Sequence, residues 1–369
     1  MKEAEVRLQE RRKRVLEAVG MKKPDRVPVV LEYAGFAAQV TNTPMAEYVS
    51  TPPRATATMI EAWQKVGDGD AINYGTFNPY ALAYLFLSKV RVPGVDLPAD
   101  ELWQVDEREL MTREDYQVLL EMGWPAFFKK FLAERVFDDV PESARLENLP
   151  EVDVLHEWAR LGVPVLAGED VTTPLELLSG GRTLMGFVTD MFEIPDTVEA
   201  AMEEICPHLA KGACARNQSG FPAVWVGGWR AAPSLLSPKL WERFAWPYLK
   251  RLVEEVVESG QIALMHLDSN WTSQLARFRE LPGGRCILAT DGETDLFQAK
   301  RILGDHLCLM GDVPASLLYL GEPEEVKDYC RRLIKGLGPE GFILQSGCDI
   351  PANARLENVR AMVETALEG

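Results

Sequence analysis

Residues 262–268 read IALMHLD, a short apolar run that ends in a histidine and a carboxylate. The run follows a helical stretch at 238–259 and has the length and composition of a buried β-strand. Similar short runs, punctuated by glycine or proline, recur along the chain at 26–33, 71–74, 163–168, 223–227, 286–290, 307–311 and 342–346. Short buried strands that alternate with helices predict parallel βα units.

About eight such units favour a closed barrel over an open sheet, because a large open sheet would tend to divide into halves. We therefore expect an α/β protein with a (β/α)8 TIM barrel. An amphipathic helix at 3–19 precedes the first strand and ends at Gly20. Residues 77–160 interrupt the alternation and predict a long insertion near the barrel mouth. No linker or shift in composition divides the chain, so residues 1–369 are predicted to form one domain.

The composition narrows the classes of partner. The formal net charge of the 369 residues is −17, which disfavours nucleic acid because phosphates select clustered lysine and arginine. The N-terminal segment has no apolar core of a signal peptide, and no run approaches the roughly 18 apolar residues of a membrane helix. The six cysteines form no CxxC pair. We expect a cytoplasmic protein with reduced cysteines that contacts neither nucleic acid nor a membrane.

Residues that follow the strands are the candidates for the active site, because a βα barrel carries its chemistry at the carboxyl ends of its strands. In this chain they are rich in carboxylates and poor in lysine and arginine. They are Glu32, Tyr33, Asn73, Tyr74, Glu169, Asp170, Trp229, Arg230, His266, Asp268, Asp291, Asp312, Cys348 and Asp349.

His266 and Asp268 are two residues apart, so an extended strand aims both side chains in one direction. Cys348 follows the strand predicted at 342–346. If both strands face one mouth, an imidazole, a carboxylate and a thiolate meet there. Three such ligands with one open position are the usual arrangement of catalytic zinc. The alternative is that His266 is a hydrogen-bonded barrel histidine and that Cys348 only fills space.

Several segments in this order resemble the uroporphyrinogen decarboxylase-like superfamily. The resemblance implies a (β/α)8 barrel. The superfamily contains decarboxylases and a branch of methyltransferases that move methyl groups to or from a corrinoid, commonly with zinc. The segments are KPDRVP at 23–28, 181–195, 236–248, DLFQAKRILG at 295–304, GDVP at 311–314, SGCDIP at 346–351 and 357–359.

The resemblance favours the methyltransferase branch over the decarboxylases. The decarboxylase pattern has an arginine-rich segment after the first strand and a late Gly-His-Gly, whereas this chain has LEYAGF at 31–36 and GCD at 347–349. Glu32 and Asp291 would also repel a polycarboxylate. Thiol-methylating members carry His-x-Cys and a distant cysteine as zinc ligands. His266 and Cys348 match that pattern, but Asp268 replaces the middle cysteine and would leave zinc a harder Lewis acid.

The leading hypothesis is a methyltransferase that moves a methyl group from a small donor, a methoxylated aromatic, to the cobalt of a corrinoid protein docked over the mouth. The leaving phenolate needs an acid or a Lewis acid. Zinc on His266, Asp268 and Cys348 would act as the Lewis acid. Glu169 would act as the acid that donates a proton, if burial raises its pKa. The candidate catalytic residues are His266, Glu169 and Asp291. The aromatic candidates for the substrate slot are Tyr33, Phe36, Tyr74, Trp225, Trp229 and Trp271.

Three alternatives stay open. One is a zinc-dependent methylcobalamin:thiol methyltransferase, and another is a corrinoid- or porphyrin-binding protein without turnover, in which the carboxylates form a solvated rim. A uroporphyrinogen decarboxylase is the least favoured. The sequence leaves open the methyl donor, the corrinoid partner, the binding of a metal and whether the chain forms a homo-oligomer.

Overall fold

The computed structural model describes residues 2–217, 221 and 223–368, so Met1 and Gly369 at the ends of the predicted domain lie outside it. In this part of the chain six parallel strands form one sheet in the order β10-β9-β8-β7-β6-β5, and β1 pairs with β2. The strands of both sheets are β1 (Val30–Leu31), β2 (Ala71–Ile72), β5 (Ala167–Thr172), β6 (Ala223–Gly228), β7 (Ile262–Leu267), β8 (Cys286–Thr290), β9 (Cys308–Val313) and β10 (Phe342–Ser346).

Two isolated parallel bridges join the small sheet to both ends of the large one. They pair Val29 with Leu344 and Ile72 with Val165. The eight parallel strands therefore form a closed ring, which confirms the predicted α/β barrel class. The run at 163–168 is the one strand whose position was predicted wrongly. Its strand starts at Ala167 and continues through polar residues to Thr172, because the pairing partner β6 sets where the ladder forms.

Alternate side chains of the strands fill the interior of the ring. Ile262 and Leu264 belong to this inner cluster, whereas Ala263 and Met265 pack outward against the layer of helices. The first helix, α1 (Lys2–Val19), adds Val15 and Ala18 to the inner cluster and so closes the end at which the strands begin. The same two-residue period places His266 on the inner face, one step beyond Leu264 toward the mouth.

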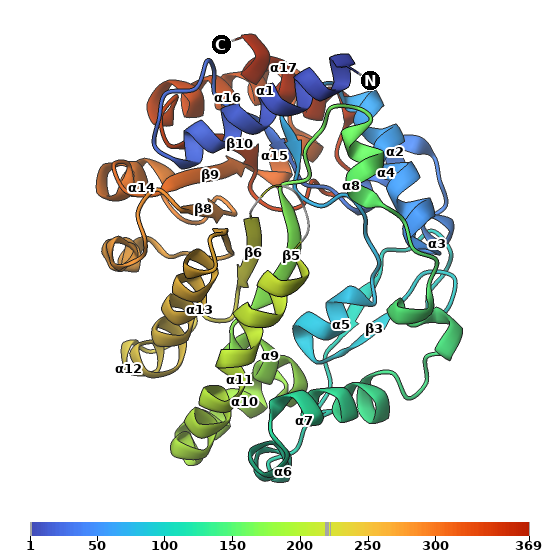
Figure 1. Cartoon of the computed structure of the whole chain (residues 1–369), viewed down its shortest axis with the longest axis vertical. Helices are drawn as coiled ribbons and strands as arrows, with labels where there is room; N and C mark the ends of the chain where they lie inside the picture. Colours follow the sequence, from blue (N-terminus) through green and yellow to red (C-terminus); the bar gives the residue numbers. More distant parts are fainter. Residues whose placement is uncertain (1, 218–220, 222, 369) are drawn as a thin grey trace.

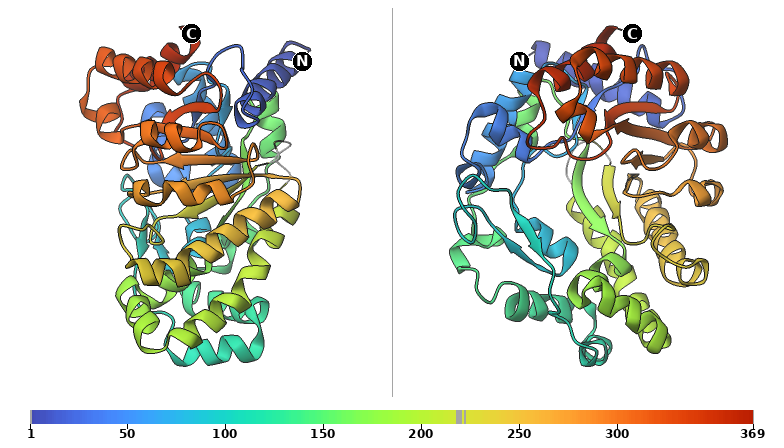
Figure 2. Two further views of the ribbon diagram at one scale, coloured as in Figure 1. Left: turned by 90° about the vertical axis from the view of Figure 1, so that its left-hand side faces the viewer. Right: turned by 180° about the vertical axis from the view of Figure 1, so that it is seen from behind.

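Helices cover the outside of the ring, and both chain ends lie at the same end of the molecule (Figures 1 and 2). Among the described residues, no helix is both long and apolar enough to span a membrane. The helices outside 77–160 are α2 (Gly35–Thr41), α3 (Met45–Tyr48), α4 (Pro52–Val66), α9 (Pro174–Arg182), α10 (Leu184–Glu193), α11 (Pro195–Arg216), α12 (Pro238–Leu240), η4 (Trp241–Ala245), α13 (Trp246–Glu258), η5 (Thr272–Glu280), α14 (Leu296–Leu303), α15 (Ala315–Leu320), α16 (Pro323–Leu337) and α17 (Leu356–Glu368).

The segment 77–160 lies between β2 and β5 and extends away from the ring (Figure 1). It contains an antiparallel pair, β3 (Lys89–Arg91) with β4 (Gln104–Asp106), and mostly short helices. These helices are α5 (Ala81–Phe86), α6 (Glu114–Met122), α7 (Trp124–Phe131), η1 (Leu132–Val136), η2 (Glu142–Ala144), η3 (Leu146–Asn148) and α8 (Val154–Ala159).

Candidate functional site

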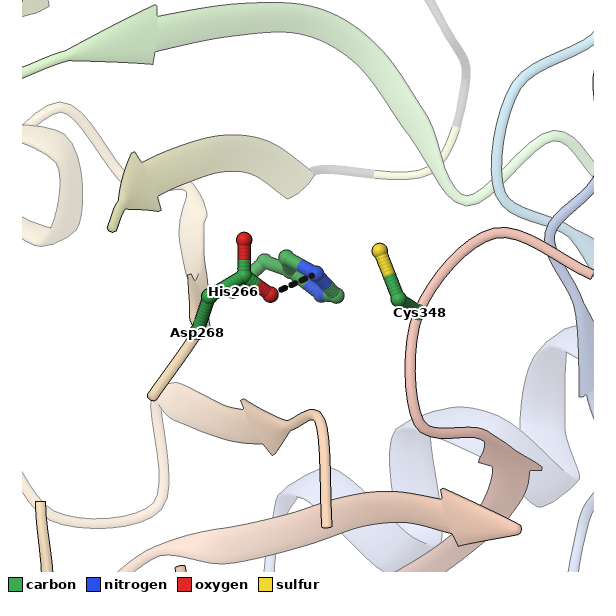
Figure 3. A group of neighbouring side chains, drawn as sticks. All are labelled: His266, Asp268 and Cys348. Carbon is green, nitrogen blue, oxygen red and sulfur yellow. Dashed lines mark ion pairs between the residues drawn. The ribbon is translucent and has the colours of Figure 1, made fainter. Parts of the chain in front are cut away.

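The barrel brings together the three residues that the sequence selected as metal ligands. His266 is near the end of β7, Asp268 follows that strand, and Cys348 follows β10. One ligand atom from each lies within 4.8 Å of the other two. The imidazole lies between the carboxylate and the thiol, with His266 Nε2 3.2 Å from Asp268 Oδ1 (Figure 3). Tetrahedral zinc with these donors places them about 3.3–3.7 Å apart, so small side-chain shifts would suffice.

His266 is buried without hydrogen bonds. Its side chain is 3% exposed and stacks on the indole of Trp225 at a centroid distance of 5.5 Å. Among the described residues neither ring nitrogen forms a well-directed hydrogen bond, although Nε2 makes an ion-pair contact with Asp268. A buried polar atom left unpaired costs about 1–3 kcal/mol, so these nitrogens indicate a missing partner. A metal ion is a partner that fits this donor set.

The charges at the site change the pKa values of its members. Burial lowers the pKa of His266, but Asp268, Cys348 and Glu32 raise it, and the net pKa is well above the ordinary value. Burial raises the pKa of the Cys348 thiol, and the nearby imidazole only partly offsets this. Because a metal binds the deprotonated forms, metal binding here would release protons.

Carboxylates surround this group. Glu32 is 5% exposed, and its Oε2 accepts hydrogen bonds from Asn73 Nδ2 at 2.6 Å and Gln345 Nε2 at 2.7 Å. Burial, and then the charge of Glu32, raises the pKa of Asp349 well above its usual range. Burial likewise raises the pKa of Tyr74, with further contributions from neighbouring carboxylates and Cys348. None of the largest charge effects on these groups comes from lysine or arginine, so the site disfavours anions.

Glu169 does not reach this group, although it was predicted to be a catalytic acid. It lies beside Val224, which packs outward, and Arg216 Nε donates to its carboxylate at 3.0 Å. An irregularity in β5 between Ala167 and Glu169 reverses the alternation that would have turned Glu169 inward. The next residue, Asp170, therefore faces inward beside Trp225, and burial followed by the charge of Glu169 raises its pKa to about 6.

Asp291 and Trp271 hold the loop after β7. Asp291 accepts hydrogen bonds from the backbone N–H groups of Ser269 at 2.7 Å and Glu293 at 3.0 Å. The fully buried Trp271 donates its indole N–H to the carbonyl oxygen of Asp268 at 2.8 Å. The carboxylate and the indole thus help to fix the backbone that carries Asp268, and their predicted roles in catalysis and in the substrate slot stay predictions.

The aromatic candidates divide between two layers. Tyr33 and Phe36 are buried in the outer core, where the Tyr33 hydroxyl donates to the carbonyl oxygen of Met59 at 2.9 Å. This corrects their predicted role in the substrate slot. Tyr74, Trp225 and Trp229 pack against the inner cluster instead. A Cβ added at Gly227 would lie 2.3 Å from the ring of Trp225 and 2.7 Å from that of Trp229, so only glycine admits both indoles here.

Glu176 is a buried carboxylate that no sequence pattern had indicated. It lies on α9, and one of its oxygens, Oε1, accepts hydrogen bonds from the backbone N–H groups of Trp229, Arg230 and Ala231, each at 2.9 Å. Burial raises its pKa to about 7, although these N–H groups lower it. Glu176 thereby fixes the turn that presents Trp229.

Replacing Glu176 with glutamine is expected to change how stability depends on pH. The unfolded chain loses this proton near pH 4–5 and the folded protein near pH 7, so ionisation costs stability as the pH rises. The wild type should therefore lose on the order of 3 kcal/mol relative to Glu176→Gln between about pH 5 and pH 8. Denaturant unfolding at both pH values measures this difference. Glu258→Gln, at an exposed position, is the control, and parallel pH profiles for wild type and Glu176→Gln would contradict the expectation.

The fold and the site define a parallel βα barrel with a candidate metal centre at its mouth. The family model described as "Uroporphyrinogen decarboxylase (URO-D)" matches residues 154–368. The chain belongs to the uroporphyrinogen decarboxylase family, and this membership supports a catalytic activity.

Individual relatives are distant. Uroporphyrinogen decarboxylase of Coxiella burnetii is 30% identical over 201 residues, covering 51% of this chain and 52% of the relative. That of Gloeobacter violaceus is 26% identical over 179 residues, covering 47% and 49%. The chain thus spans about half the length of the curated relatives it matches.

Two solved structures share the fold. A methyltransferase from Methanosarcina mazei superposes with a TM-score of 0.71 at 18% identity, covering 97% of this chain and 98% of its own. A B12-independent methionine synthase from a Shewanella species gives 0.50 at 10% identity, with 93% and 98% covered.

Proposed function

We propose that the protein is a methyltransferase that moves a methyl group from a methoxylated aromatic donor to the cobalt of a corrinoid held by a separate protein. The observation that carries the proposal is the buried imidazole of His266, whose two nitrogens form no well-directed hydrogen bond and lie beside Asp268 and Cys348. The fold likeness to a methyltransferase is consistent with it. The acidic interior argues against a polycarboxylate substrate and hence against the decarboxylase alternative.

His266, Asp268 and Cys348 are the residues that would hold zinc. When bound, zinc would supply a Lewis acid that polarises the ether oxygen of the donor. Three protein ligands leave a fourth position open, as in catalytic zinc sites. Binding of the donor and protonation of the leaving oxygen would depend on the protein's own side chains.

Those side chains would bind the ring and protonate the leaving oxygen. In the transfer the methyl–oxygen bond breaks, a methyl–cobalt bond forms, and the phenolate oxygen takes a proton. Asp170 holds a proton more readily than an ordinary aspartate because its pKa is about 6, and it takes the role that the sequence had suggested for Glu169. Tyr74, Trp225 and Trp229 offer flat apolar surfaces to the ring.

The test is methyl transfer from a panel of methoxyphenols to reduced free cobalamin, with zinc supplied. The cobalt spectrum reports conversion of Co(I) to methyl-Co(III), and chromatography reports the phenol that is released. We expect both to appear together with at least one ether, at a rate proportional to protein. A panel on which neither signal exceeds the protein-free control would overturn the donor class.

A second candidate is the methylcobalamin:thiol methyltransferase, which the convergence of His266 and Cys348 favours. Zinc on these residues would lower the pKa of a bound thiol. Loss of methylcobalamin in the presence of 2-mercaptoethanol, with no transfer from any ether, would assign the protein to this activity. A protein that binds corrinoid but catalyses neither reaction would match the binding-protein alternative.

A further inference from the structure

A cavity of about 690 Å³ lies at the side of the barrel, and no member of the His266, Asp268 and Cys348 group lines it. It lies between β5, α9 and α11 of the barrel and α5, α7 and η3 of the 77–160 segment. Its lining includes Tyr84, Trp124, Phe128, Glu169, Asp170 and Arg216.

The cavity exists because β2 is too short to cover its neighbour. β2 contains two residues, and the last backbone hydrogen bond between its segment and β5 runs from Ala167 N to Asn73 O at 3.1 Å. Within the described residues, no backbone hydrogen bond joins 168–172 to the segment that follows β2. The carboxyl half of β5 thus has a free edge, and α5 and α7 cover it across the cavity.

Asp170 connects this cavity with the barrel interior. It lines the cavity, yet it pairs in register with Trp225 of the inner cluster, and its charge acts on Tyr74. Trp225 in turn stacks on His266. Next to Asp170, Glu169 accepts a hydrogen bond from Arg216, whose side chain is 62% exposed to solvent. The lining of the cavity therefore includes both a solvent-exposed residue of α11 and a residue that also faces the barrel interior.

The aromatic side chains that line the cavity favour a ligand with an aromatic ring. The rings of Trp124 and Phe128 lie 4.8 Å apart, and those of Tyr84 and Phe128 lie 6.3 Å apart, which leaves aromatic faces and edges for a further ring to contact. The lining carries three carboxylates, on Glu147, Glu169 and Asp170, against one guanidinium on Arg216. This excess of negative charge disfavours a carboxylate on the ligand, while a phenolic hydroxyl can donate to a carboxylate oxygen.

We propose that this lateral cavity binds an uncharged phenolic ring and is the side access by which the methyl donor reaches the barrel interior. The inference rests on the proposed function, which it deepens in two respects. It names the donor as a neutral methoxyphenol and not a methoxybenzoate. It also separates the two substrates in space, since the donor enters through the wall beside β5 and leaves the mouth free for the corrinoid.

Gly212 allows the cavity to be filled without touching the His266 group. It lies on α11 and lines the cavity, and a Cβ there would lie 3.2 Å from Arg216 Nη1, the end of a flexible side chain. Leucine is a better helix former than glycine, so Gly212→Leu should keep the helix while occupying the space. Gly212→Ala adds one carbon and is the matched control.

The probe is 2-methoxyphenol, titrated into the full-length protein without corrinoid and followed by ligand-observed NMR and tryptophan fluorescence. We expect Gly212→Leu to raise its Kd by about 10-fold or more, whereas Gly212→Ala stays within about 2-fold of wild type. With the wild type, 4-methoxybenzoate should bind more weakly than 2-methoxyphenol. Equal Kd values for wild type and Gly212→Leu, no binding to wild type, or tighter binding of the benzoate would each overturn the proposal.

The methyl-transfer assay separates this inference from the proposed function. Loss of 2-methoxyphenol binding in Gly212→Leu, in a wild-type background that transfers no methyl group, would support the cavity and reject the transfer reaction. Methyl transfer that is equally fast in wild type and Gly212→Leu would support the reaction and reject the lateral access.

Discussion

Replacing His266 with glutamine is expected to reduce methyl transfer by at least about 100-fold while the protein stays folded. The imidazole is the most buried member of the candidate metal group, and neither of its nitrogens forms a well-directed hydrogen bond among the described residues. Glutamine keeps a polar end of similar reach but provides no imidazole nitrogen for zinc. The rate of formation of methyl-Co(III) and the zinc content of the purified protein are the two measurements.

His156→Gln is the matched control, because His156 is exposed on α8 within the 77–160 segment. It should retain the wild-type rate and zinc content. Far-UV circular dichroism and the thermal midpoint establish that both variants are folded. A folded His266→Gln protein with the wild-type rate would remove this histidine from the mechanism.

Replacing Cys348 with serine is expected to weaken zinc binding by about 100-fold or more, because a thiolate ligand is lost and serine stays protonated at neutral pH. Competition with a chromophoric chelator measures the affinity. Burial raises the pKa of this thiol, so zinc binding to the wild type must displace a proton from it and should weaken as the pH falls. The serine hydroxyl keeps its proton when zinc binds, so this variant should show a shallower pH dependence.

Cys214→Ser is the control for this change, since Cys214 is also partly buried but lies on α11, away from the candidate group. Its zinc affinity should equal that of the wild type. If Cys348→Ser bound zinc as tightly as wild type at every pH, the cysteine would not be a ligand, and His266 would need another explanation for its unpartnered nitrogens.

The sequence was sufficient for the fold class and for part of the candidate site. Seven of the predicted runs contain all or most of the strand that the structure places there, because a buried parallel strand needs a continuous apolar run whatever its neighbours are. The spacing of His266 and Asp268 likewise placed both on one side of β7, since strand alternation is a local property. The same alternation, applied to Glu32 and Tyr33, would have placed only one of the two inside the barrel.

Other features depended on contacts between distant segments. Cys348 meets His266 only because β10 and β7 belong to one closed ring, and 74 residues (268–341) separate β7 from β10 along the chain. Because of the irregularity in β5, Asp170 faces inward in place of Glu169, since the ladder with β6 sets which side chains face inward. Glu176 is held by three N–H groups more than 50 residues away, and the cavity exists because β2 ends before β5 does. Local pattern thus determined the strands and the paired ligands, whereas ring closure and strand register decided which side chains share the site.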